Sequence, residues 1–158
     1  MDRDKLKARF SYWLEALRLK GHWDVTLRFV EDASFTKTGD FKVDPDDKKA
    51  VLLLNAKNPK YENLEEVIIH ELMHLKLYPL DQVTEGLIDA HYEQGSDEHR
   101  FAYGQFMLTL EQTVAELTKC YLRAFGEDKK LSYGRVDAQQ GFNALYEGLK
   151  PYGDDTEK

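Results

Sequence analysis

The stretch EEVIIHELMHLKLYP, residues 65 to 79, contains the pattern His-Glu-x-x-His, on which both the predicted fold and the predicted chemistry depend. Side chains four residues apart lie on the same face of an α-helix, so His70 and His74 can direct their imidazole rings at one point. Neutral imidazole nitrogens are common zinc ligands, and a catalytic zinc ion keeps one position for water. Glu71, beside the first histidine, can take a proton from that water. The stretch therefore predicts a zinc-binding helix that carries a catalytic base.

The same pattern can arise without a metal. By composition arithmetic it occurs by chance in about one chain in a hundred of this length. In that case both histidines are packed side chains of a buried helix, and Glu71 is an ion-pair partner. Buried polar groups without partners cost roughly a few kcal/mol each, and a metal ion supplies such partners. The residues favour metal binding and leave the accidental pattern open.

Composition limits the class of protein. The chain of 158 residues has a formal net charge of -7, and its Lys and Arg residues form no basic block, so we expect no direct nucleic-acid binding. The charged start lacks the apolar core of a signal peptide, and no segment stays apolar long enough to cross a bilayer, so we expect no membrane partner. The single cysteine, Cys120, cannot form an internal disulfide, which favours a cytoplasmic protein.

The sequence around the motif predicts an α+β fold in one domain, residues 1–150, followed by a frayed acidic tail, residues 151–158. Apolar residues at helical spacing indicate a first helix from Lys5 to Leu19, closed by Gly21. We then expect a small, mostly antiparallel three-stranded sheet, with strands at 23–31, around 41–43 and at 50–56.

The helix of the motif is expected to begin at an N-cap, Asn63, and to end at Tyr78 because Pro79 follows. Its apolar residues spread around most of its circumference, which is typical of a helix at the centre of a domain. Further helical patterns follow in three places: a weak one over 83–92, a long one over 97–125 and a short one over 135–150.

A third metal ligand has to come from elsewhere in the chain. Leu77 and Leu80 stand where short-spaced metallohydrolases place a glycine and a ligand, which excludes that class. A later helical segment, 108–122, offers Glu111 and Glu116. At 100° per residue, Glu111 falls at the centre of an apolar arc and Glu116 on the polar side. A carboxylate inside an apolar arc is unexpected unless it is paired or bound to metal, so Glu111 is the favoured ligand, with a buried ion pair as the alternative.

With His70, Glu71 and His74 on one helix and Glu111 on a later one, the chain resembles the gluzincin metallopeptidases. The likeness is to their minimal single-domain forms in bacteria and phages, and it covers about residues 5 to 125. It implies a zincin-like fold, zinc held by His70, His74 and Glu111, Glu71 as general base, and hydrolysis of a peptide or protein substrate. Two other classes stay open: a zinc-binding module without turnover that acts in regulation or in a phage-associated interaction, and a phage structural protein with an incidental motif.

The chain departs from this family in its second shell. Many gluzincins place an acidic residue four positions after the third ligand, where it orients a ligating histidine, and here that position is Ala115. The residue that would stabilise the oxyanion is not assigned; His91, His99, Tyr92 and Tyr103 are candidates by residue type only. A di-iron carboxylate bundle is excluded because it needs a second Glu-x-x-His.

Overall fold

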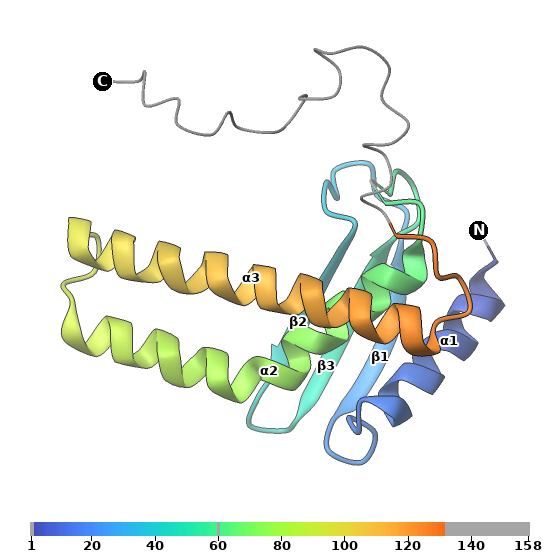
Figure 1. Cartoon of the computed structure of the whole chain (residues 1–158), viewed down its shortest axis with the longest axis horizontal. Coiled ribbons are helices and arrows are strands. Elements are labelled where there is room, and N and C mark those ends of the chain that lie inside the picture. Colours follow the sequence, from blue (N-terminus) through green and yellow to red (C-terminus); the bar gives the residue numbers. More distant parts are fainter. Residues whose placement is uncertain (1, 60, 132–158) are drawn as a thin grey trace, which may run out of the picture.

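The computed structural model describes residues 2–59 and 61–131, which form three helices and one three-stranded sheet (Figure 1). The elements in chain order are α1 (Arg3–Ala16), β1 (Asp24–Val30), β2 (Gly39–Asp44), β3 (Lys49–Asn55), α2 (Leu64–His91) and α3 (Asp97–Phe125). The predicted α+β class is thereby confirmed, with the first helix, the three strands, the motif helix and the long later helix in the predicted order. The separate helix predicted over 83–92 is wrong, because that segment is the outer part of α2. The helix expected over 135–150, the domain end at 150 and the tail at 151–158 lie outside the described residues.

The sheet is mixed, which corrects the expectation of a mostly antiparallel one. Its strand order is β1-β3-β2, with β1 parallel to β3 and β2 antiparallel to β3. The turn at 45–48 joins β2 to β3 as a hairpin. The segment 31–38 carries the chain from β1 to the opposite edge of the sheet, so that β3 returns between the two earlier strands. Within residues 2–59 and 61–131, strand β2 is consequently an edge strand with one neighbour.

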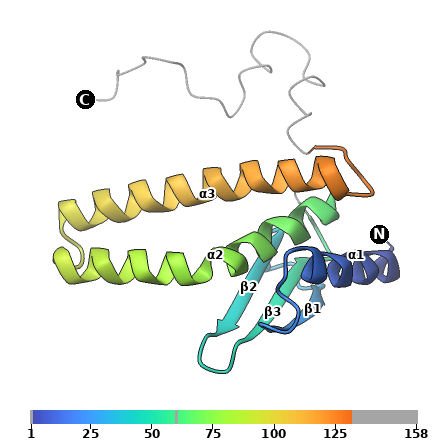
Figure 2. The same ribbon diagram turned by 60° about the horizontal axis from the view of Figure 1, so that its bottom comes forward.

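Helix α2 is the central element, as its wide apolar surface predicted, and it lies between the sheet and α3 (Figure 2). Ile68 and Leu72 of α2 are at most 1 % exposed and belong to the same core cluster as Leu52 and Leu54 of β3. Such burial contributes roughly 1.5–3 kcal/mol for each large aliphatic side chain. The first three turns of α2 are therefore held rigidly between two layers.

A buried carboxylate, Glu65, ties the start of α2 to both other helices. Its Oε1 accepts hydrogen bonds from Arg9 Nε at 2.6 Å and Trp13 Nε1 at 2.8 Å. Its Oε2 accepts from the backbone N–H groups of Glu127 and Asp128, both at 3.2 Å. All the partners of this carboxylate come from α1 and from the segment after α3, so it fixes where the motif helix begins.

The sequence predicted the start of α2 correctly and its end incorrectly. Asn63 is the N-cap as predicted, and its side chain accepts from the N–H groups of Glu65 and Glu66. The predicted end at Tyr78 is wrong, because the helix continues through Pro79 to His91. A proline removes one helical hydrogen bond and crowds the preceding turn, yet α2 continues past it with α3 packed alongside.

Helix α1 ends at Ala16, before the predicted Leu19, and Gly21 does not close it. The N–H of Leu19 donates to Leu14 O at 2.8 Å and that of Arg18 to Glu15 O at 2.9 Å, the bonding of a Schellman end. Arg18 has φ 54°, a left-handed conformation that glycine usually supplies at this position.

The outer halves of α2 and α3 extend beyond the sheet as a helical hairpin (Figures 1 and 2). Two polar contacts join them: His99 Nε2 lies 2.8 Å from Asp89 Oδ1, and Tyr103 donates to Glu85 at 3.1 Å. The hairpin is therefore held mainly by contacts between its own two helices.

No helix in the described part of the chain combines the length and the apolar character that a membrane span requires.

Candidate metal centre

His70 and His74 lie one turn apart on α2, on the side that faces α3. Their Nε2 atoms are 3.2 Å apart, and their ring centroids are 4.8 Å apart. Glu111 approaches both rings from α3, with Oε2 3.5 Å from His70 Nε2 and Oε1 3.2 Å from His74 Nε2. The three side chains bring one potential ligand atom each to within 4.8 Å of one another, so together they could hold one metal ion.

Burial and charge keep His70 in the form that binds metals. Burial lowers the pKa of His70 first, the neighbouring His74 lowers it further, and Glu111 opposes both effects. The side chains of His70 and His74 are 29 % and 13 % exposed. A lowered pKa favours the neutral imidazole, whose free nitrogen is the ligand atom.

Glu111 is less buried than the helical wheel predicted. Its side chain is 50 % exposed, and the buried residues of α3 are Leu110, Val114, Thr118 and Leu122. The expected centre of the apolar arc was wrong because Leu108, counted in that arc, is 53 % exposed. Glu111 lies at the edge of the buried face, and Glu116 is exposed and outside the cluster.

The carboxyl group of Glu71 lies beside the start of strand β2. Burial raises its pKa from the ordinary 4.5 to about 7, with further contributions from the charges of Asp40 and Glu111, while Lys37 acts in the opposite direction. A carboxyl group with a pKa near neutrality can both accept and return a proton at physiological pH. Its position next to His70 therefore suits a base that serves the same site.

Strand β2 forms one wall of this site, which the sequence did not indicate. A Cβ atom on Gly39 would lie 2.7 Å from Glu71 Oε1, so the glycine lets the strand approach the carboxylate closely. Phe41 stacks on His74, with ring centroids 6.2 Å apart and an interplanar angle of 24°. Glycine at the start of a strand often marks close approach of another group, and this was the available signal.

The other candidates for catalytic roles lie on the outer hairpin. His99 pairs with Asp89 and Tyr103 donates to Glu85, while His91 Nδ1 is 2.9 Å from the Leu87 carbonyl. None of these side chains belongs to the metal-ligand cluster found in the described residues.

One acidic residue on the same helix, Asp81, interacts with the charge of His74. Asp81 lies two turns further along α2, and its Oδ1 is buried without a hydrogen-bond partner among the described residues. Burial and Glu85 raise its pKa, while Gln82 and the charge of His74 act against the rise. The imidazole of His74 is thus within electrostatic reach of this carboxyl group.

The geometry stands without support from relatives. Comparisons of the chain with protein-family models, with curated proteins and with solved structures found no match.

Proposed function

We propose that the protein is a zinc-dependent peptidase in which His70, His74 and Glu111 hold the metal and Glu71 is the general base. The observation that carries the proposal is the spacing of the donor atoms. Two ligands about 2.05 Å from a tetrahedral zinc ion are about 3.3 Å apart. The two histidine Nε2 atoms are 3.2 Å apart, and Glu111 brings Oε1 to 3.2 Å from His74 Nε2 and Oε2 to 3.5 Å from His70 Nε2, so its two oxygens and the two nitrogens surround one point where an ion of this size could lie.

The proposed chemistry follows from the residues around the candidate metal position. A bound zinc ion lowers the pKa of water at its open position and polarises a substrate carbonyl. Glu71, whose pKa is about 7, accepts the proton of the attacking water and passes it to the leaving amine. Phe41 of β2 lies beside the His74 ring, with the ring centroids 6.2 Å apart.

Strand β2, which forms one wall of the site, favours an extended peptide as the substrate. Among the described residues, strand β2 has a strand neighbour on one side only, and its other edge carries backbone N–H and C=O groups without strand partners there. Such an edge can pair with an extended chain. Because β2 begins at Gly39, against Glu71, a peptide paired with it would pass the base.

A zinc-binding module without turnover is the second candidate. It is favoured by two contacts in the outer hairpin. His99 pairs with Asp89 and Tyr103 donates to Glu85, so these two side chains are engaged there and do not stabilise an oxyanion at the metal centre. Such a module would use the ion to join α2 and α3 in a regulatory or interaction protein.

The first experiment is metal analysis of the purified protein with two matched variants. We expect about one zinc ion per chain in the wild type, loss of zinc in Glu111→Ala, and retention in Glu116→Ala, whose side chain is exposed on the same helix. Zinc loss in Glu116→Ala alone would reject the ligand set. A wild type without zinc whose stability is unchanged by His70→Ala would establish the accidental pattern.

The second experiment separates the enzyme from the module. Glu71→Gln should keep the zinc ion and abolish cleavage of a broad peptide library. A zinc-loaded wild type that cleaves none of the library would reject the peptidase and support the module.

A further inference from the structure

One face of α2 is buried against α1 in its first turns. The face begins at Glu65, whose carboxylate accepts hydrogen bonds from Arg9 and Trp13 of α1. Ile69 and Met73 follow at spacings of four residues on the same side of the helix, and they are 0 % and 3 % exposed. Both belong to the core cluster that includes Trp13. This side of α2 is therefore a helix-packing face where α1 lies beside it.

The same face continues into the outer hairpin, where its apolar side chains are exposed. Leu80, Val83 and Leu87 follow Met73 and Lys76 at alternating spacings of three and four residues, which keeps them on one side of the helix. They are 61 %, 61 % and 56 % exposed, so no other element of residues 2–59 and 61–131 covers them. We call these three residues the apolar stripe. Single exposed apolar residues are common, whereas a run at this spacing is typical of a helix that packs against another helix.

The apolar stripe is self-complementary. When two α2 helices lie antiparallel with a two-fold axis between positions 83 and 84, Leu80 of each copy faces Leu87 of the other. The two Val83 side chains then meet near the axis, as an isologous contact requires. The positions that flank the stripe on the helix are uncharged: Pro79, Thr84 and Gly86. Two copies can therefore approach each other here without repulsion between flanking charges.

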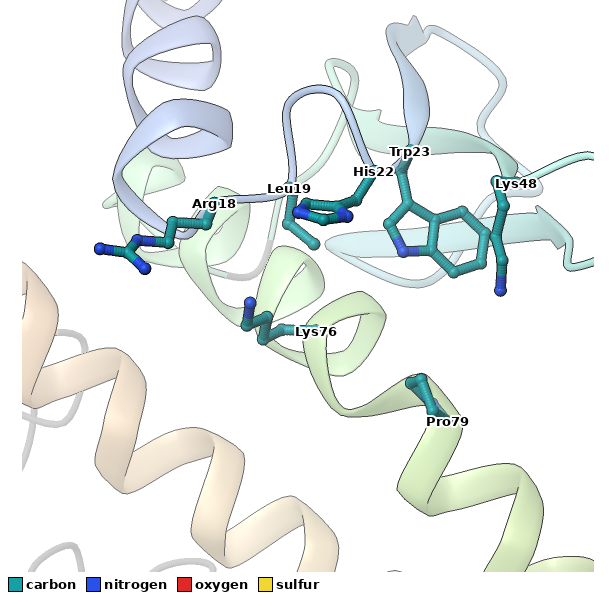
Figure 3. A pocket seen from close by; sticks show the side chains of 7 residues that line it. All are labelled: Arg18, Leu19, His22, Trp23, Lys48, Lys76 and Pro79. Carbon is teal, nitrogen blue, oxygen red and sulfur yellow. The ribbon is translucent and has the colours of Figure 1, made fainter.

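The two ends of this face carry opposite charge. At the inner end, Arg18 and Lys76 line one hollow beside Pro79 (Figure 3). Neither cation makes an ion pair within the described part of the chain. At the outer end, residues 89–100 of the hairpin tip contain one basic residue, Arg100, and four acidic ones: Asp89, Glu93, Asp97 and Glu98.

Antiparallel pairing brings these opposite charges together. With the axis between positions 83 and 84, position 76 of each copy faces position 91 of the other, so the acidic tip of one copy lies at the basic end of the other. Glu93 and Glu98 make no ion pair among the described residues, and Arg100 pairs with Asp97. Charge complementarity of this kind sets the partner and the direction of pairing.

We propose that the apolar stripe is the contact of a homodimer in which the outer halves of two α2 helices pack antiparallel. The two helical hairpins then form a four-helix arrangement that lies outside both sheets. His70 and His74 do not belong to the stripe, so the proposal does not depend on the metal site or on the peptidase function.

The test is sedimentation equilibrium of the full chain from about 1 to about 500 µM, where dimerisation follows mass action. We expect a monomer at the low end and a dimer at the high end. Val83→Glu places like charges beside the two-fold axis and should raise the dissociation constant at least about tenfold. Leu108→Glu is the matched control, because Leu108 is 53 % exposed on α3 and lies outside the stripe; it should dimerise as the wild type does.

Three results would overturn the proposal. One is a wild type that stays monomeric at every concentration, and another is a dimer that Val83→Glu leaves intact. The third is a monomer whose urea stability falls in Val83→Glu and not in Leu108→Glu, which would show that another part of the same chain covers the stripe.

Charge reversal tests the direction of pairing. Lys76→Glu and Glu93→Lys should each weaken the dimer by about two- to fivefold, and the double variant should recover, since opposite charges again lie near each other. In a parallel pair, position 76 faces position 76, so Glu93→Lys would have no effect and the double variant would stay as weak as Lys76→Glu. That outcome would reject the antiparallel homodimer.

Discussion

Gly39→Ala tests the close approach of β2 to the motif helix. The new Cβ would lie 2.6 Å from Val67 Cγ1, 2.7 Å from Glu71 Oε1 and 2.9 Å from Glu71 Cγ. Ordinary contacts between carbon atoms are about 3.5–4.0 Å, so β2 or α2 must move by about 1 Å. Val67 is 6 % exposed and part of the core, which leaves it little room to yield.

The expected cost follows from two opposing effects. Overpacking of this kind costs about 1–3 kcal/mol, and removing a glycine from a strand returns about 0.5–1 kcal/mol. The net loss of unfolding free energy is therefore about 1–2 kcal/mol, which urea denaturation in the presence of a chelator measures directly. If Glu71 is the base, its displacement by about 1 Å should also lower kcat, by up to about a hundredfold.

The matched control is Gly86→Ala in the outer half of α2. A Cβ at Gly86 meets nothing within 4 Å, so alanine there should stabilise the helix by about 0.5–1 kcal/mol. Gly39→Ala with the stability of the wild type, or with the same gain as Gly86→Ala, would refute the close approach of β2 to Glu71.

Two further predictions concern buried carboxyl groups. In metal-free protein the folded pKa of Glu71 is about 7, above its ordinary 4.5, so its contribution to stability is full below pH 4.5 and is lost as the pH rises through 7. That loss is roughly 3 kcal/mol of unfolding free energy. Glutamine at position 71 does not ionise, so the urea midpoint of Glu71→Gln should rise relative to that of the wild type between pH 4.5 and 8. A difference between the two midpoints that stays constant with pH would contradict the prediction. Glu65→Ala leaves the Arg9 guanidinium buried without its carboxylate and should cost about 3–5 kcal/mol in urea denaturation. Glu62→Ala, which removes an exposed partner of Lys130, should cost less than about 1 kcal/mol, and equal losses in the two variants would reject the buried network.

Local signals predicted the helices well and the strand neighbours poorly. The N-cap at Asn63 and the four-residue spacing of the histidines are properties of a single helix, so they can be read from adjacent residues. Strand β1 pairs with β3 because the segment 31–38 leads the chain to the opposite edge of the sheet, where β2 forms. This path cannot be predicted from the residues of either strand. At Pro79 the local rule fails, because it ends the helix there while α2 continues to His91.

Glu111 shows why a helical wheel is an incomplete guide to burial. The wheel treats every apolar residue as part of a buried face, whereas Leu108 of α3 is 53 % exposed. The predicted burial of Glu111 was therefore wrong, although the structure brings this residue, and not Glu116, beside the two histidines. The role of Glu111 as a ligand stays a prediction. Gly39 and Phe41 were missed as site residues because they are distant in sequence from the motif.

The uneven burial along the helical hairpin has a consequence for its opening. In α2, Ile88 is the only buried residue after Leu75, and in α3 the first buried residue is Leu110. The hairpin tip therefore forms a separate unit of low stability whose amide hydrogens exchange through local unfolding, while those of the inner turns exchange only when the core opens. His74 and Glu111 lie at the boundary between the two units. An ion bound there would block opening of the tip from spreading inward, and the exchange rates just inside the boundary would report its occupancy.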